Sequence, residues 1–299
     1  MEKSKMKRDW MARYALYLSI GVILLATTAS LVTLMFPERI YVDETESFVA
    51  QDAGQNLVNL VLAIPLLGYS LLWMRTGNEK ARYIWMGTLF YFVYTYLSAV
   101  MLFAFNSLFL VYVAIFSMAL YALVLVFIDM DIRSLRIAVS QRVSRRTVYA
   151  LFFLVAMILL LWLPEIISLS ISGKASERLA VDGQRTYVIT ALDLGLLVPL
   201  GLLSGLLITK REPLGFVLAP VLLIKGMTLA AAVISMIAFM VVAGTPPAIA
   251  EILMFVVMFT VLLYITVTYM ADFVPMKDVD LDGQGQSRLL ATRAVAEVH

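Results

Sequence analysis

Eight stretches of the sequence consist almost entirely of apolar side chains, and each is long enough to cross a membrane as a helix. An α-helix rises about 1.5 Å per residue, so roughly 20 apolar residues cross the ~30 Å hydrocarbon core of a bilayer. We therefore predict an all-α polytopic membrane protein with eight transmembrane helices in a lipid bilayer. The predicted spans are residues 13–36, 56–74, 82–104, 107–129, 147–169, 187–209, 214–241 and 248–270.

The composition agrees with this prediction and excludes several kinds of chemistry. Of the 299 residues, 62% are hydrophobic and 15% are charged, whereas a soluble domain carries about 25% charged residues. The chain has no cysteine, which excludes disulfides and thiolate metal sites. Its single histidine is the last residue, His299, so haem ligation, histidine-bound zinc and a Ser-His-Asp triad lack an internal imidazole. We expect no cofactor, no metal ion and no nucleic-acid partner.

The distribution of Lys and Arg predicts the orientation in the membrane. With eight spans both termini lie on the same side, and that side holds 18 of the 23 Lys and Arg residues. The opposite side holds four, namely Arg39, Lys174, Arg178 and Arg185, and Lys225 lies within a span. Positive charge favours the cytoplasmic side. The sequence therefore predicts a multi-pass protein of the cell membrane with both termini in the cytoplasm.

Three segments lie outside the predicted spans at the cytoplasmic side. The N-terminal segment 1–12 is basic, and the polar tail 273–299 is expected to be disordered. The link 130–146 mixes apolar residues with arginines, which predicts an amphipathic helix. Through residues 133–146 this helix would bind anionic lipids of the inner leaflet. An ordinary basic cytoplasmic loop is the alternative.

The chain contains an internal similarity at an offset of 134 residues, which divides it into two four-helix halves, 13–129 and 147–272. The matching pairs are Asn56 and Thr190, Asn59 and Asp193, Pro65 and Pro199, Ser70 and Ser204, and Tyr91 and Lys225. Because each half has an even number of spans, both halves insert in the same direction, which predicts a parallel repeat. Chance resemblance between leucine-rich helices is the alternative.

Polar residues inside the spans are candidates for a functional site, because their burial in a membrane is costly. Asp193 and Lys225 lie on consecutive spans at depths that differ by roughly 5 Å, so we predict that they form a pair, directly or through water. The candidate ligand or proton site contains these two residues together with Asn56, Asn59, Tyr91, Thr190, Glu165 and Glu251. The two glutamates lie near the outer ends of their spans and would complete a vestibule. A structural ion pair between two helices is the alternative.

Three function classes follow from these features. A transporter or a membrane module that binds a small ligand or a proton is favoured by the repeat, by the prolines at matching positions and by the midplane charge. A structural or sensor-type membrane protein is the second class, with a retinal-type Schiff base on Lys225 as a special case. A membrane-embedded lipid enzyme has the least support, because the sequence has no DxxD or HxxxH motif. The sequence names neither the ligand nor an oligomeric state.

Overall fold

The computed structural model describes residues 2–130, 132 and 136–276. In these residues the helices are α1 (Glu2–Met35), α2 (Pro37–Ile40), α3 (Glu46–Val58), α4 (Ile64–Met74), α5 (Lys80–Leu102), α6 (Phe109–Asp129), α7 (Gln141–Ser172), α8 (Glu177–Val181), α9 (Val188–Leu192), α10 (Val198–Thr209), α11 (Pro213–Val242) and α12 (Ile249–Asp272). Two π-helical turns, η1 (Asn59–Ala63) and η2 (Asp193–Leu197), join α3 to α4 and α9 to α10. Two strands, β1 (Arg136–Ala138) and β2 (Val274–Met276), pair antiparallel.

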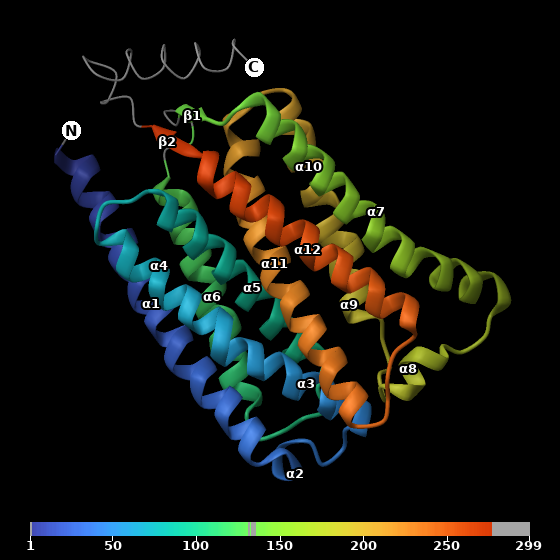
Figure 1. Ribbon diagram of the computed structural model, residues 1–299. Coiled ribbons are helices and arrows are strands. Elements are labelled where there is room, and N and C mark those ends of the chain that lie inside the picture. Colours follow the sequence, from blue (N-terminus) through green and yellow to red (C-terminus); the bar gives the residue numbers. More distant parts are fainter. Residues whose placement is uncertain (1, 131, 133–135, 277–299) are drawn as a thin grey trace.

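Eight helices of the described chain are long and apolar enough to cross a membrane, which confirms the predicted number of spans. The long helices run side by side, with β1 and β2 at one end of the bundle and α2 and α8 at the other (Figure 1). We call these the strand end and the α8 end. The chain is therefore a helical bundle of the kind that integral membrane proteins form.

Helices α5 and α11 form the centre of this bundle. Their most apolar windows are 72% and 67% buried, whereas those of the other six spans are between 22% and 33% buried. The two central helices pack on each other, and α11 also packs on α3, α10 and α12. Around them α1 packs on α6, and α7 packs on α10 and α12. Most apolar side chains of the outer helices thus face outward, where a bilayer would cover them.

Two glycines allow the central helices to approach their neighbours closely. A Cβ atom on Gly87 of α5 would lie 2.7 Å from the Cβ atom of Ile224 in α11. A Cβ atom on Gly54 of α3 would lie 2.5 Å from the backbone nitrogen of Met236 in α11. Because small residues let membrane helices pack at short distance, these contacts hold α11 against both α3 and α5.

The π-helical turns lie at corresponding places in the sequence. Asn59 opens η1 and Asp193 opens η2, and these two residues are 134 positions apart. In each case a proline follows six residues later, at Pro65 and Pro199. A π-turn inserts one extra residue into a helix and is common at functional sites. The sequence analysis predicted the matching positions of these prolines but not the π-turns.

The structure corrects several predicted boundaries. The second span does not start at residue 56, because a helix runs from Glu46 through η1 to Met74. Its start is fixed by Thr45, whose side chain accepts a hydrogen bond from the backbone nitrogen of Phe48. Residues 46–55 therefore belong to this helix, and one of them, Asp52, is buried.

The predicted amphipathic helix over 130–146 is wrong for residues 136–138, whereas residues 141–146 are helical as the start of α7. Residues 136–138 are strand β1, with Ile137 opposite Pro275, and α7 begins at Gln141 after the N-cap Ser140. Residues 131 and 133–135 of this link lie outside the described residues. The same holds for 277–299 of the tail that was expected to be disordered, whereas 274–276 form β2.

Candidate functional site

A cavity of about 360 Å³ lies between the helices and reaches from the α8 end to the middle of the bundle. Its walls come from both halves of the chain, with α3 and α5 from the first half and α7, α9, α11 and α12 from the second. Most of the lining is aliphatic or aromatic. The charged residues that line it are Asp52, Arg178, Asp182, Asp193, Lys225 and Glu251. An apolar cavity with a few convergent polar groups is the usual form of a small-molecule site.

Asp193 is held in this cavity by donors from two other helices. Tyr94 of α5 donates its hydroxyl to Oδ1 at 2.6 Å, and Trp162 of α7 donates its indole N–H to Oδ2 at 2.9 Å. Asp193 is only 8% exposed. Both carboxylate oxygens are thus satisfied without a basic side chain, and the aspartate joins the two halves of the bundle through Tyr94.

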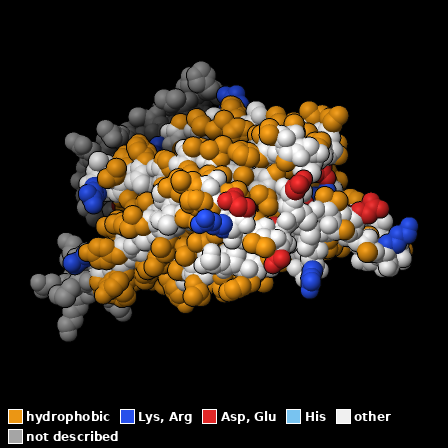
Figure 2. Space-filling model, turned by 90° about the horizontal axis from the view of Figure 1, so that it is seen from below, with side chains coloured by type: hydrophobic (Ala, Val, Ile, Leu, Met, Phe, Trp, Pro, Cys, Tyr) orange, Lys and Arg blue, Asp and Glu red, His pale blue; other side chains and the backbone are white. Residues whose placement is uncertain are grey.

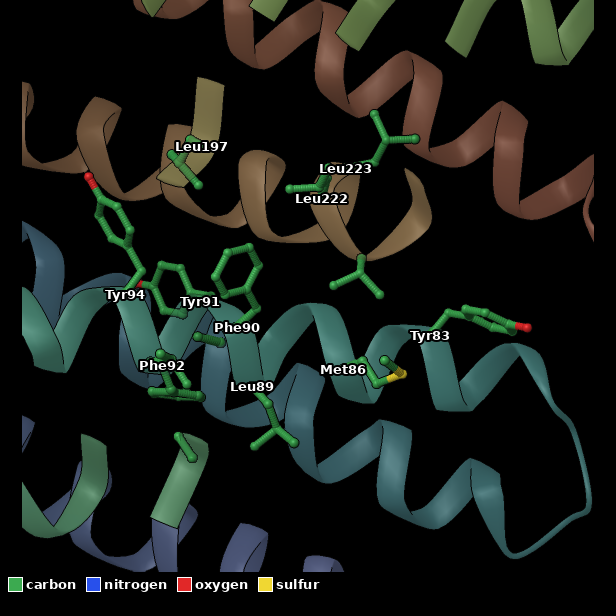
Figure 3. Close-up of a cluster of buried hydrophobic side chains, with 14 of the residues drawn as sticks. Tyr83, Met86, Leu89, Phe90, Tyr91, Phe92, Tyr94, Leu197, Leu222 and Leu223 are labelled. Atoms are coloured by element: carbon green, nitrogen blue, oxygen red, sulfur yellow. The ribbon is translucent and has the colours of Figure 1, made fainter. Parts of the chain in front are cut away.

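Lys225 lies beside this group but makes no hydrogen bond. Its side chain is 1% exposed, and within the described chain its Nζ atom has no hydrogen-bond partner. The ammonium lies over the ring of Tyr94, 3.6 Å from the ring centroid, and 5.9 Å from the centroid of Phe90. Both rings project from α5 toward Leu197 and Leu222, whereas Leu89 and Phe92 project to the opposite side (Figure 3).

The predicted pair of Asp193 and Lys225 is therefore an indirect one in this structure. The two residues line the same cavity and interact electrostatically, but no ion pair joins them within the described residues. Tyr94 connects them, because its ring contacts the ammonium and its hydroxyl binds the carboxylate. A cation over a tyrosine face is stabilised by about 0.5–2 kcal/mol, depending on desolvation.

The corresponding residues of the first half are bonded directly. The Tyr91 hydroxyl donates to Asn59 Oδ1 at 2.8 Å, and Gln55 donates its amide to the Tyr91 oxygen and, at 3.4 Å, to Asn59 Oδ1. Tyr91 is fully buried and Asn59 lines the cavity. This group is neutral and internally satisfied.

Asp52 is a site residue that the sequence analysis missed. It is 8% exposed, lines the cavity, and accepts hydrogen bonds from the Tyr41 hydroxyl and the Asn56 amide. Asn56 in turn accepts a hydrogen bond of 2.8 Å from Ser30 of α1. Burial and the nearby carboxylate raise the pKa of Tyr41 far above its usual range, so its hydroxyl stays protonated and remains a donor. The sequence could have indicated Asp52 by its spacing, because Asp52, Asn56 and Asn59 follow one another at four and three residues and so lie on one face of a helix.

The α8 end of the cavity carries an ion-pair cluster around Arg178. Its guanidinium binds Glu165 of α7 at 3.2 Å and also binds Glu251 of α12, while it lies 5.4 Å from the ring centroid of Trp162. Tyr187 adds a hydrogen bond of 2.7 Å to Glu165. Acidic and basic side chains appear on this end of the molecule among hydrophobic ones (Figure 2).

The eight predicted site residues all lie at or next to this one cavity. Asn56, Asn59, Thr190, Asp193, Lys225 and Glu251 line it, and Thr190 is buried there. Tyr91 and Glu165 do not line it, but each bonds to a residue that does, Asn59 and Arg178 respectively. Besides Asp52, the residues missed from the sequence are Tyr94, Trp162 and Arg178.

Comparison with protein-family models, with curated proteins and with solved structures finds no match to this chain. Its function is therefore inferred from the geometry of the cavity and of the residues that line it.

Proposed function

We propose that this chain binds a small organic ligand with an anionic group at Lys225 and carries it across the membrane. The observation behind the proposal is the Lys225 ammonium, which is buried at a cavity wall without a hydrogen-bond partner in the described chain. Buried polar groups are nearly always paired, so an unpaired ammonium at a cavity wall is a candidate contact for a ligand. Because the lysine stem is flexible, rotation about its bonds can bring the ammonium to a bound carboxylate or phosphate.

The position of the cavity favours transport over simple binding. Its walls belong to both four-helix halves, and the π-turns that open with Asn59 and Asp193 face it from each half. These matched turns support a parallel repeat of residues 13–129 and 147–272, and transporters bind substrates between such repeats near the midplane. In this proposal the α8 end faces outward and both termini lie in the cytoplasm of the plasma membrane, as the Lys and Arg distribution indicates.

The test compares the purified wild-type protein with Lys225→Met, using octanoate in calorimetric titrations. We expect binding by the wild type and at least a tenfold loss in the variant, since a charge-assisted bond to the carboxylate is removed. Lys225→Met should keep a melting temperature close to the wild type, because Nζ makes no hydrogen bond and Asp193 retains both donors. Lys210→Met, which removes an exposed lysine, is the matched control and should bind as the wild type does.

Transport is measured separately with octanesulfonate, whose sulfonate stays ionised and does not cross lipid unaided. Proteoliposomes with wild-type protein should accumulate it, and those with Lys225→Met should not. Equal octanoate titrations for wild type and Lys225→Met would overturn the proposal and leave Lys225 as a structural residue. Binding without uptake would restrict the function to ligand binding, as in a sensor.

A further inference from the structure

The cavity has a second polar region around Asp52, toward the α8 end from Asn59. Asp52 precedes Asn59 by seven residues, which places it about 10 Å further along the helix axis. Asn59 is bonded to Tyr91, and the Lys225 ammonium lies over Tyr94, one turn of α5 further toward the α8 end. The level of the ammonium is therefore about 5 Å nearer to Asp52 than that of Asn59. A buried carboxylate and a buried ammonium thus occupy different levels of one cavity.

Aromatic rings form the wall of the cavity next to Asp52. The Phe103 ring packs edge-on against Phe48 and Tyr112, with centroids 5.0 and 5.5 Å apart, and Tyr96 lies 5.9 Å from Tyr112. All four of these rings line the cavity. Aromatic faces beside a carboxylate are the surroundings that bind organic ammonium groups.

Two of these rings carry hydroxyls without a hydrogen bond. Tyr96 and Tyr112 are each 3% exposed, and neither hydroxyl has a partner of hydrogen-bond geometry in the described chain. Ser30 is near Tyr96 and Tyr41 is near Tyr112, but neither pair meets that geometry. A ligand amine that donates to Asp52 has these hydroxyl oxygens available as further acceptors.

The balance of acidic and basic residues in the cavity lining also favours a ligand that carries an amine. Its lining holds four acidic residues, Asp52, Asp182, Asp193 and Glu251, but only two basic ones, Arg178 and Lys225. Arg178 is already paired with Glu165 and Glu251. A ligand with only an anionic group would add to this negative charge, whereas a zwitterion adds none overall and brings an amine that can pair with one of the acidic groups.

We infer that the ligand is a small zwitterion, whose anionic group binds Lys225 and whose amine binds Asp52 against the rings of Tyr96 and Tyr112. This inference rests on the proposed function, because it takes the anionic group at Lys225 as given. It adds the second charge of the ligand and the separation of the two charged residues that bind it, roughly 6 Å along the helix axis in addition to their separation across the cavity.

The test measures binding of octanoate, octylamine and 8-aminooctanoate to the full-length protein by calorimetric titration. The wild type should bind 8-aminooctanoate at least tenfold more tightly than octanoate, as expected for an added charge-assisted bond. Asp52→Asn should abolish this preference, measured as the ratio of the two affinities in the same variant. Asp182→Asn, the matched control, removes an acidic residue that lines the same cavity, and should keep the preference.

A second pair of variants keeps the test decisive if Asp52→Asn does not fold. Tyr96→Phe and Tyr112→Phe retain the rings and remove hydroxyls that make no hydrogen bond, so both should fold. Each should reduce the preference for 8-aminooctanoate by about twofold to fivefold, as for one weak hydrogen bond. Equal binding of octanoate and 8-aminooctanoate by the wild type would overturn the inference alone. Binding of neither would overturn the proposed function as well.

Discussion

A buried polar group lies at each of the two π-turns, and the two groups differ in how their hydrogen bonds are made. In the first half, Asn59 and Tyr91 are neutral, and their hydrogen bonds are made among themselves and with Gln55. In the second half, Asp193 is charged and takes its donors from two other helices, while Lys225 makes no hydrogen bond within the described residues. The first group is complete within the protein, whereas the second leaves the Lys225 ammonium without a hydrogen-bond acceptor. This difference is why we place the ligand at Lys225 and not at Tyr91.

The largest expected effect comes from removing the polar residue that opens each π-turn. Asp193→Ala leaves the Lys225 ammonium buried without a carboxylate and orphans two donors, so it should lower the free energy of unfolding by ~3–5 kcal/mol. Asn59→Ala removes a neutral acceptor and should cost about 1–3 kcal/mol. Chemical unfolding in detergent micelles followed by circular dichroism measures both. Adding Lys225→Met to Asp193→Ala should recover part of the loss, and equal costs for the two single variants would break the comparison.

A smaller effect should separate the two tyrosines of α5. Tyr94→Phe removes a donor to a carboxylate and should cost about 1.5–3 kcal/mol, whereas Tyr91→Phe removes a bond to a neutral amide and should cost about 0.5–1.5 kcal/mol. Both variants keep the aromatic ring at the substituted position, so Lys225 still contacts the ring at position 94. The same unfolding measurement compares them. A larger cost for Tyr91→Phe would show that the first group, not the second, carries the greater electrostatic energy.

The smallest effect is expected at the α8 end. Arg178 and its partners Glu165 and Glu251 are 35%, 25% and 28% exposed, so Arg178→Gln should cost no more than ~1 kcal/mol. Because exposed charges are screened, the difference from wild type should shrink as NaCl is raised from 0.05 to about 1 M. Thermal unfolding at both salt concentrations measures this. A cost above about 2 kcal/mol that persists in salt would show that Arg178 stabilises the fold as strongly as a buried charged residue such as Asp193 does.

The number of spans could be predicted from the sequence because a membrane constrains composition directly: about 20 apolar residues are needed whatever the packing. The sequence also grouped Asn59, Tyr91, Asp193 and Lys225 as members of one candidate site, because the 134-residue offset matches the first two positions with the last two. The contacts that these side chains make could not be predicted from the sequence. Whether Lys225 touches a carboxylate or a ring depends on side-chain rotamers, which hydrophobic patterns do not encode.

Other parts of the site were missed for identifiable reasons. Asp52 lay before the apolar window, and only the structure shows that the helix extends to Glu46 and buries it. Tyr94 and Trp162 are aromatic residues in apolar spans, where packing and ligand binding produce the same sequence pattern. Arg178 belongs to a short loop helix, and its contacts depend on how that loop folds back over α7 and α12.

The contact at Gly54 bears on how the cavity can open. There α3 and α11 meet backbone to backbone, since a Cβ atom would lie 2.5 Å from the nitrogen of Met236. No side chain stands between the two helices that could change its rotamer and let them slide. At this level α3 and α11 behave as one rigid unit, so the proposed function requires the other lining helices, α7, α9 and α12, to move when a ligand enters. Gly54→Leu would force α3 and α11 apart at this level.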